Sequence, residues 1–231
     1  VARLPLSKTI TPPDYTAISA FTTLSAYSDA TGQSIGSGNA GNPDLKPLRS
    51  TNFDANLEWY FAPRAFVSMG AFHMEMATYI TDGFKMGNYR TEVTPTGAPA
   101  GTPPVIVNAP YRLLTQVNKK ASVTGLEFGF ETPVAGNFGV SANYTFADGH
   151  DESGHVLRGA TKHTANLGGF FENDQWSARL NYSYRSDTFI GLDRNSEYSQ
   201  KGGGVVSASV GYKFNEQFSL NLDALNLNNP T

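Results

Sequence analysis

The sequence predicts an all-β protein, a transmembrane antiparallel β-barrel of which this chain supplies about nine strands. Three observations carry the prediction: apolar and polar residues alternate along most of the chain, short turns alternate with long connecting segments, and aromatic residues gather near the predicted strand ends. Only 16% of the residues are charged, 12% are aromatic, and there are 23 glycines. This composition favours strands and tight turns over helices.

Alternation is clearest where apolar side chains occupy every second position of a short segment. Such segments lie at residues 52–61, 124–130, 138–146, 176–185, 206–214 and 218–224. Because alternate residues of a strand point to opposite faces of a sheet, each segment has one apolar and one polar face. Residues 65–80 are apolar on both faces, and a further strand is expected near residues 2–10. Each predicted strand is close to the roughly 10 residues that a tilted barrel strand needs.

The connections between these strands alternate in length. Short turns are predicted at residues 62–64, 133–137, 172–175 and 215–217, and long segments rich in Gly, Pro, Ser, Thr and Asn at residues 12–48, 83–110, 148–161 and 186–204. Short turns at one end and long loops at the other are typical of outer-membrane barrels, whose short turns are periplasmic. A soluble β-sandwich is the alternative, but its outward faces rarely carry Phe, Tyr and Trp repeatedly.

Aromatic residues mark both ends of the predicted strands. Trp59, Phe138 and Trp176 flank short turns, whereas Tyr144 and Tyr184 lie toward the long segments. A barrel that spans a bilayer carries an aromatic girdle at each of its two interfaces. The distribution therefore favours a membrane barrel over a soluble sheet.

Composition and motifs exclude several classes of function. A net charge of -3 and an isoelectric point near 5.8 provide no basic surface for a phosphate backbone, so no nucleic-acid partner is expected. The sequence has no cysteine and no HExxH, GxSxG or P-loop motif. We therefore predict no metal site, no cofactor and no enzymatic activity. The enzymatic alternative, an outer-membrane phospholipase or protease, would need a Ser or Asp nucleophile beside a histidine at the barrel rim.

The odd strand number predicts that the chain is part of a larger wall. Bacterial single-chain barrels have even strand counts, and an open sheet edge in lipid leaves backbone groups unsatisfied at a cost of several kcal/mol each. We therefore expect the chain to be a fragment of a longer protein.

Two segments and the chain terminus resemble TonB-dependent outer-membrane receptors. The first reads GNPDLKP at residues 41–47, followed by LEWYF at residues 57–61. The second reads LRGATKHTANLGGFFENDQWSARLNYSYR at residues 157–185, and DALNLNN at residues 223–229 resembles the penultimate strand of that family. The resemblance implies a structural signature role for six residues of the first segment: Asn42, Pro43, Asp44, Leu45, Lys46 and Pro47.

The resemblance also implies an architecture and a cellular role. Residues 1–231 would form the C-terminal part of a barrel of about 22 strands in a bacterial outer membrane, roughly strands 13 to 21, without the N-terminal plug domain, its TonB box or the final strand. The implied activity is energised uptake of a scarce small-molecule nutrient, such as a siderophore or an oligosaccharide. The implied partners are outer-membrane lipid, the plug and remaining barrel strands of the parent chain, and TonB acting through the absent plug.

Two alternatives to active uptake stay open. The first is a passive porin-like channel, which would have no plug. The second is a receptor-only barrel that binds a partner protein through residues 12–48 and 83–110.

Binding residues are expected in the long loops, because loops face the medium and often carry function. The candidates are Tyr89, Arg90, Tyr111 and Arg112 in one loop, His155 and Arg158 in a second, and Asp193, Arg194 and Tyr198 in a third. A tyrosine beside Arg or Asp can stack on a sugar ring and bind its hydroxyl groups, and an arginine can hold an anionic iron chelate.

Overall fold

The computed structural model consists almost entirely of β-strands. It describes residues 1–95, 97–193 and 196–228, and within residues 192–197 it describes no side chains. One short helix, α1 (Tyr15–Ile18), begins after Asp14, whose carboxylate accepts a hydrogen bond from the Thr16 amide. The described residues contain no apolar helix of the length needed to traverse a bilayer.

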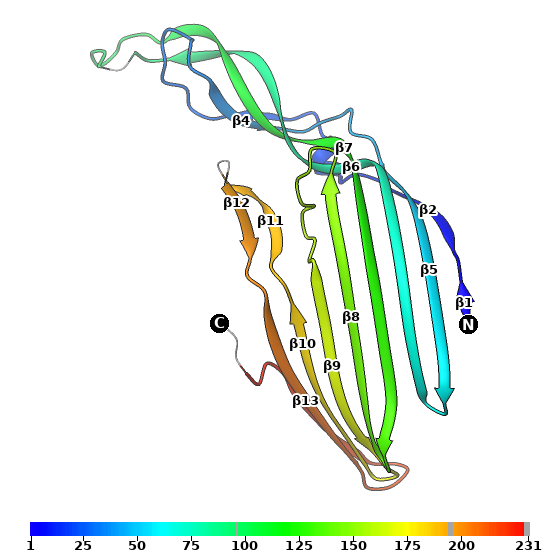
Figure 1. Ribbon diagram of the computed structural model, residues 1–231. Helices are drawn as coiled ribbons and strands as arrows, with labels where there is room; N and C mark the ends of the chain where they lie inside the picture. The colour runs from blue at the N-terminus through cyan, green and yellow to red at the C-terminus, as the bar shows by residue number, and fades with distance from the viewer. Residues whose placement is uncertain (96, 194–195, 229–231) are drawn as a thin grey trace. The chain divides into compact units, whose positions relative to one another are not determined.

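Fourteen strands follow one another along the described chain (Figure 1). Their bounds are β1 (Ala2–Arg3), β2 (Leu6–Thr11), β3 (Thr22–Leu24), β4 (Gly36–Ala40), β5 (Leu48–Ala62), β6 (Ala65–Val93), β7 (Val105–Ala135), β8 (Phe138–Asp151), β9 (His163–Glu172), β10 (Trp176–Arg185), β11 (Thr188–Asp193), β12 (Ser196–Gln200), β13 (Gly203–Lys213) and β14 (Ser219–Ala224).

The chain forms two compact units. The wall unit comprises Val1–Lys8, Ser50–Met76 and Ala121–Thr231, and the hairpin unit comprises Thr9–Arg49 and Ala77–Lys120. Strands β6 and β7 contribute residues to both units, because each is about 30 residues long.

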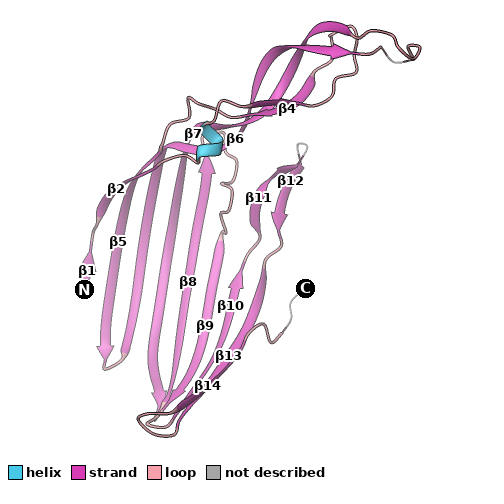
Figure 2. Cartoon of the chain, turned by 180° about the vertical axis from the view of Figure 1, so that it is seen from behind, coloured by secondary structure: helices cyan, strands magenta, loops and turns pink. Residues whose placement is uncertain are grey.

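In the main sheet the strands lie side by side, each hydrogen-bonded to the next, in the order β1-β5-β6-β7-β8-β9-β10-β13-β14 (Figure 2). This path has nine strands among the described residues, which agrees with the predicted number. Strands β1 and β5, β5 and β6, and each neighbouring pair from β7 to β14 on this path run antiparallel. For example, β10 and β13 pair without interruption from Trp176↔Tyr212 to Arg185↔Gly203. The predicted all-β antiparallel fold is therefore confirmed.

The four predicted short turns are confirmed, and local geometry explains each. The β5–β6 turn uses Arg64 at φ 63°, and the β7–β8 turn uses Gly136 at φ 57°. In the β9–β10 turn the Asn173 side chain accepts hydrogen bonds from two backbone amides, at 3.0 and 2.6 Å. Asn215 does the same in the β13–β14 turn, at 2.8 and 3.0 Å. These side chains close the turns because Asn can replace a backbone acceptor.

The predicted long loops contain more strand than expected. β6 continues to Val93 and β7 begins at Val105, so most of the predicted loop 83–110 is strand. β11 and β12 pair within residues 186–204, and α1, β3 and β4 lie within residues 12–48. The sequence prediction was wrong in these parts because Gly, Ser, Thr and Asn favour loops on average, whereas backbone pairing needs no apolar side chain.

The two faces of the wall unit differ in chemistry, as the alternation predicts. One face is apolar from strand to strand, because the registers place in one row Phe138, Phe171, Ala178, Val210 and Leu222. No other described part of the wall unit covers Leu222 in this row, which is 70% exposed.

The other face of the wall unit is polar and rich in small residues. Asn143 and Asn166 form a register pair there, and the Asn166 amide donates a hydrogen bond of 2.7 Å to the Asn143 side-chain oxygen. Gly168 pairs with both Ser141 and Asn181 in the adjoining row. The polar face of such a sheet is stable against water or polar groups, and the apolar face is stable only against an apolar environment.

Candidate functional site

Tyr111 is the most deeply buried of the predicted binding residues. It lies on β7 in the hairpin unit, is 0% exposed, and forms an apolar cluster with Ala40, Ala109 and Leu113. Its ring centroid lies 5.5 Å from that of Tyr27 and 5.8 Å from that of Tyr89. Tyr111 therefore packs in a core and offers no surface to a ligand.

Strand β4 covers this core through an uncommon pairing. It runs parallel to β7, with Gly36 opposite Tyr111 and Gly38 opposite Leu113. A Cβ atom at Gly36 would lie 2.6 Å from the Tyr111 ring, and one at Gly38 would lie 2.3 Å from the Thr23 carbonyl oxygen. Glycine is required at both positions because β4 approaches β7 and β3 so closely.

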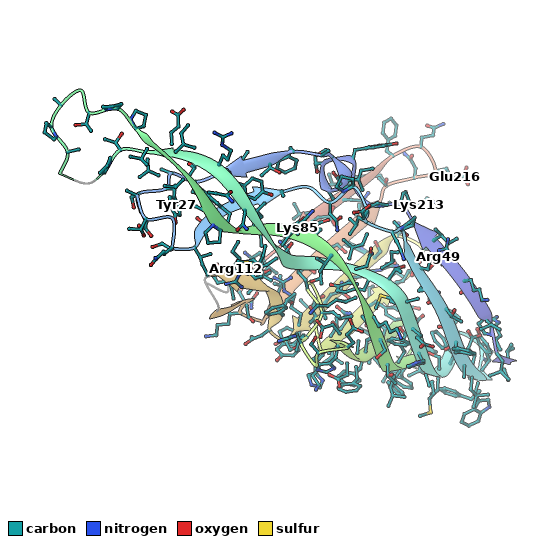
Figure 3. All side chains as sticks on the ribbon, turned by 90° about the horizontal axis from the view of Figure 1, so that it is seen from above. Tyr27, Arg49, Lys85, Arg112, Lys213 and Glu216 are labelled. Atoms are coloured by element: carbon teal, nitrogen blue, oxygen red, sulfur yellow. The ribbon has the colours of Figure 1, made fainter. Side chains whose placement is uncertain are left out.

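The opposite face of the hairpin unit carries the predicted arginine Arg112. Its guanidinium carbon lies 3.5 Å from the centre of the Phe84 ring, within the range of a cation–π contact. Phe84, Met86 and Leu114 are all exposed, and Arg90 is exposed on β6. Figure 3 shows Arg112 on the extension of β6 and β7, where Lys85 also lies. This face combines cationic and apolar groups.

Tyr89 is neither fully buried, as Tyr111 is, nor exposed, as Arg112 is. It is half-buried and packs edge-on against Tyr111, so its ring is engaged within the hairpin unit. Of the four candidates on this segment, the structure thus leaves Arg90 and Arg112 accessible to a ligand.

The signature segment at residues 42–47 is fastened to β7 by side-chain amides. Asn42 Nδ2 donates to the Gln116 carbonyl oxygen at 2.9 Å. Asn118 accepts from the Lys46 backbone amide at 2.8 Å and donates to the Lys46 carbonyl oxygen at 3.0 Å, as a neighbouring strand would.

Further interactions strengthen this attachment and tighten the segment itself. The Thr78 hydroxyl donates to the Pro47 carbonyl oxygen at 2.6 Å, and Leu45 is buried. The Asn42 side chain also accepts from the Asp44 amide at 3.2 Å, which tightens the turn. Asn118 and Thr78 were missed by sequence reasoning, because a single polar residue in a strand carries no signal of its partner 72 or 31 residues away.

The second group of candidates belongs to the wall unit. His155 Nδ1 lies 3.4 Å from the Asp151 carboxylate, which also accepts from the backbone amides of Ser153 and His155. Asp151 is nearly buried, whereas His155 is 61% exposed by side chain. Arg158 is exposed and follows the buried Leu157. This loop presents His155 and Arg158 outward on a rigid turn.

The third group is only partly described. Arg194 lies outside the described residues, as does the side chain of Asp193, whose backbone ends β11. Tyr198 lies on β12 and is 62% exposed.

A charged hollow lies on the polar face of the wall unit. It has a volume of about 210 Å³, and its lining includes Arg64, Glu131, Glu172 and Arg179. Arg64 Nη2 lies 3.9 Å from Glu172 Oε2. Because charges of both signs line it, this hollow suits water or a polar protein segment rather than an apolar ligand.

A larger hollow of about 400 Å³ lies between the β9–β10 and β13–β14 turns. Its lining includes Lys213 and Glu216, both labelled in Figure 3, together with Trp176. Polar groups dominate this lining too.

The loop that precedes β4 is organised by one carboxylate. Asp29 accepts hydrogen bonds from the Thr31 hydroxyl and from the backbone amides of Thr31, Gln33 and Ser34, at 2.6 to 3.2 Å. These bonds, the Thr31 hydroxyl foremost, hold the pKa of Asp29 well below its usual range. The charged carboxylate thus stabilises the loop beside Tyr27.

The chain matches one family model along almost its whole length. The model is described as "TonB dependent receptor-like, beta-barrel" and matches residues 4–227. No curated protein matches the chain.

Several solved structures share the fold. The siderophore receptor PirA from Acinetobacter baumannii is 19% identical, with a TM-score of 0.72, over 98% of this chain and 34% of that one. A mutant of the ferric enterobactin receptor from Pseudomonas aeruginosa is 18% identical, with a TM-score of 0.71, over 98% and 32%. The copper transporter OprC is 18% identical, with a TM-score of 0.66, over 99% and 31%. The chain thus spans about a third of the length of these structures.

Proposed function

The chain belongs to the family of TonB-dependent receptor β-barrels, and from this premise we propose that it forms part of the barrel wall and the ligand-binding surface of a receptor that takes up a scarce nutrient across a bacterial outer membrane. This is a family of receptors and transporters, not of enzymes, in agreement with the sequence prediction. In this proposal residues 1–231 form a C-terminal part of the barrel, and the parent chain supplies the plug and the remaining strands.

The observation that carries the membrane placement is the exposed apolar face of the wall unit. On β10 this face runs from Trp176 through Leu180 to Tyr184, nine residues from one aromatic to the other. On β8 it runs from Phe138 to Phe146 in the same number of residues. A tilted strand needs about 9 to 11 residues to cross a bilayer. The apolar band therefore has the length of a hydrocarbon core, with aromatics at its two borders.

The polar face of the wall unit supports a filled lumen. Its small residues leave room beside the sheet, and the hollow around Glu131 and Arg179 offers charged partners of both signs. A plug with a polar surface, hydrated where contacts are imperfect, fits such a face. This supports a plugged receptor over an open porin-like channel.

The accessible side chains of the hairpin unit favour an anionic nutrient over a neutral sugar. Tyr111 is buried and Tyr89 packs against it, so neither ring is free to stack on a sugar. Arg90 and Arg112 remain exposed, and the contact of Arg112 with Phe84 orders its guanidinium group. A planar, ordered guanidinium binds carboxylates and similar anions with little loss of side-chain entropy. We propose an anionic chelate as the substrate class.

Uptake by the full-length receptor tests this proposal. Cells that express it should accumulate a labelled anionic chelate, such as a ferric siderophore, only when TonB is active. Arg112→Gln should raise the half-saturating concentration about tenfold or more, because a hydrogen bond to a charged group contributes about 1.5 to 3 kcal/mol. Leu114→Gln on the same face serves as the matched control.

Each of the other outcomes refutes a defined part of the proposal. Accumulation without TonB would identify a passive channel, and binding without accumulation would identify a receptor-only barrel. Accumulation that depends on TonB but is unchanged in Arg112→Gln would refute the assignment of the binding surface.

A further inference from the structure

Strand β3 is the last strand of a small sheet in the hairpin unit. On one side it pairs with β4, which in turn pairs with β7. Its other side pairs with no strand among the described residues. All residues of β3 are exposed. This sheet of the hairpin unit therefore ends at an open edge.

The register shows which backbone groups lie at the open edge. The Ser25 amide, directly after β3, donates to the Ser37 carbonyl oxygen of β4 at 2.9 Å. Hydrogen-bonded and non-bonded pairs alternate between antiparallel strands, so Thr23 also bonds to β4, whereas Thr22 and Leu24 do not. The N–H and C=O groups of Thr22 and Leu24 thus point outward. In the described part of the chain they have no hydrogen-bond partner.

The sequence of β3 leaves this edge open to another strand. Natural sheets protect exposed edges with lysine, proline, bulges or very short strands, and of these β3 shows only its short length. Its residues, Thr, Thr and Leu, include two that are β-branched and favour strands. Phe21 and Leu24 are 44% and 37% exposed, so apolar contact is available beside the unpaired backbone groups. Such an edge can accept an extended peptide as an added strand.

The charge around the edge selects the kind of peptide. Between Lys8 and Lys46 the sequence has three carboxylates, Asp14, Asp29 and Asp44, and no Lys, Arg or His. Asp14 and Asp44 are exposed. A second copy of this edge would bring the same carboxylates and be repelled, whereas a strand with Lys or Arg would be attracted.

We propose that the outward backbone groups of Thr22 and Leu24, here called the β3 edge, bind an extended, cationic segment of a partner protein by strand addition. The backbone of the partner pairs with the β3 edge, and its Lys or Arg side chains are attracted by the nearby carboxylates. The proposal does not depend on the nutrient or on its uptake. The partner lies outside the cell if the long segments face the medium, as the membrane placement proposed above requires.

Hydrogen exchange on the purified full-length receptor tests the proposal. The probe is a peptide of about eight residues in which lysine and valine alternate, so that it is cationic and can form a strand. At a peptide concentration about ten times its Kd, exchange of the Thr22 and Leu24 amides should slow roughly tenfold, because protection follows the bound fraction. The Thr23 and Ser25 amides already bond to β4 and should change much less.

Two control peptides separate backbone pairing from charge. Methylation of every backbone nitrogen of the probe keeps its charge but prevents strand pairing, and this peptide should give no protection. Replacement of its lysines by glutamate keeps the backbone but reverses the charge, and should weaken binding by about tenfold or more at low salt.

Proline substitutions locate the binding edge. Thr22→Pro removes an outward N–H group and places a ring at the edge, but it removes no hydrogen bond to β4. Binding of the probe should weaken by about tenfold or more, whereas the matched control Thr22→Ala should stay within about twofold. Leu24→Pro removes the other outward N–H group and provides a second test if Thr22→Pro alters the protection of β4.

Three results would overturn the β3 edge. The first is protection of the Thr22 and Leu24 amides in the free receptor, which would mean that another part of the parent chain or a second copy already pairs with them. The second is equal protection by the methylated or the glutamate peptide. The third is unchanged binding in both proline variants. Because the assay contains no nutrient, its result is independent of the uptake proposal.

Discussion

Replacement of Tyr111 distinguishes a structural tyrosine from a ligand-binding one. Tyr111→Ala removes a fully buried ring and its contacts with Tyr27 and Tyr89. Burial of an aromatic side chain contributes about 1.5 to 3 kcal/mol, and each aromatic pair adds about 0.5 to 1.5 kcal/mol. The hairpin unit should therefore lose about 3 to 5 kcal/mol of local stability, the range observed for such truncations.

Hydrogen exchange measures this loss directly. Backbone amides of β4 and of β7 around residue 111 should exchange at least about a hundredfold faster in Tyr111→Ala, because exchange follows the free energy of local opening. Tyr111→Phe should change exchange little, since its hydroxyl group makes one long hydrogen bond of 3.4 Å, to the Ser25 carbonyl oxygen. Unchanged exchange in Tyr111→Ala together with lost ligand binding would refute the packing role.

Three further perturbations have defined outcomes. Leu180→Arg on the apolar face should cost about 2 to 4 kcal/mol in refolding into vesicles, and Asn181→Arg on the polar face much less; equal small effects would contradict a bilayer around the wall unit. Asn118→Leu removes the two hydrogen bonds to the Lys46 backbone, so the local stability of residues 42–47, measured by hydrogen exchange, should fall by about 2 to 3 kcal/mol. Unchanged protection of these amides would contradict the attachment. Folding lowers the pKa of Asp29, so the stabilisation of the loop by its carboxylate should be complete above the usual value of 3.8 and decline as the pH falls below it. The NMR signal of the Thr31 amide, which donates to Asp29, should follow this pH dependence in the native protein but not in Asp29→Asn.

The parts of the fold that sequence predicts well are those governed by local rules. The alternation from Trp176 to Tyr184 sets the faces of β10, since one residue of slip would reverse every side chain. The turn at Asn173 follows from the preference of Asn for accepting hydrogen bonds from backbone amides two or three residues further along the chain. Both signals lie within a few residues, so one sequence suffices to find them.

The candidate site was harder to predict because its features depend on distant contacts. The neighbours Tyr111 and Arg112 look alike as ligand groups, yet alternation sends them to opposite faces, and β4 then covers only Tyr111. The parallel pairing of β4 has no apolar signature, because Gly36 and Gly38, which permit the close approach, carry no side chain. The partnership of Asn118 with Lys46 spans 72 residues and is equally invisible in one sequence.

The asparagine-closed turns bear on how the wall assembles. Asn173 and Asn215 each close a hairpin turn through hydrogen bonds within three residues, which need no contact with any other strand. Closing such a short loop takes far less chain entropy than bringing together distant strands. The β9–β10 and β13–β14 hairpins are therefore suited to form first and to join the sheet as ready-made pairs, which leaves the pairing of β10 with β13 as the slower, non-local step.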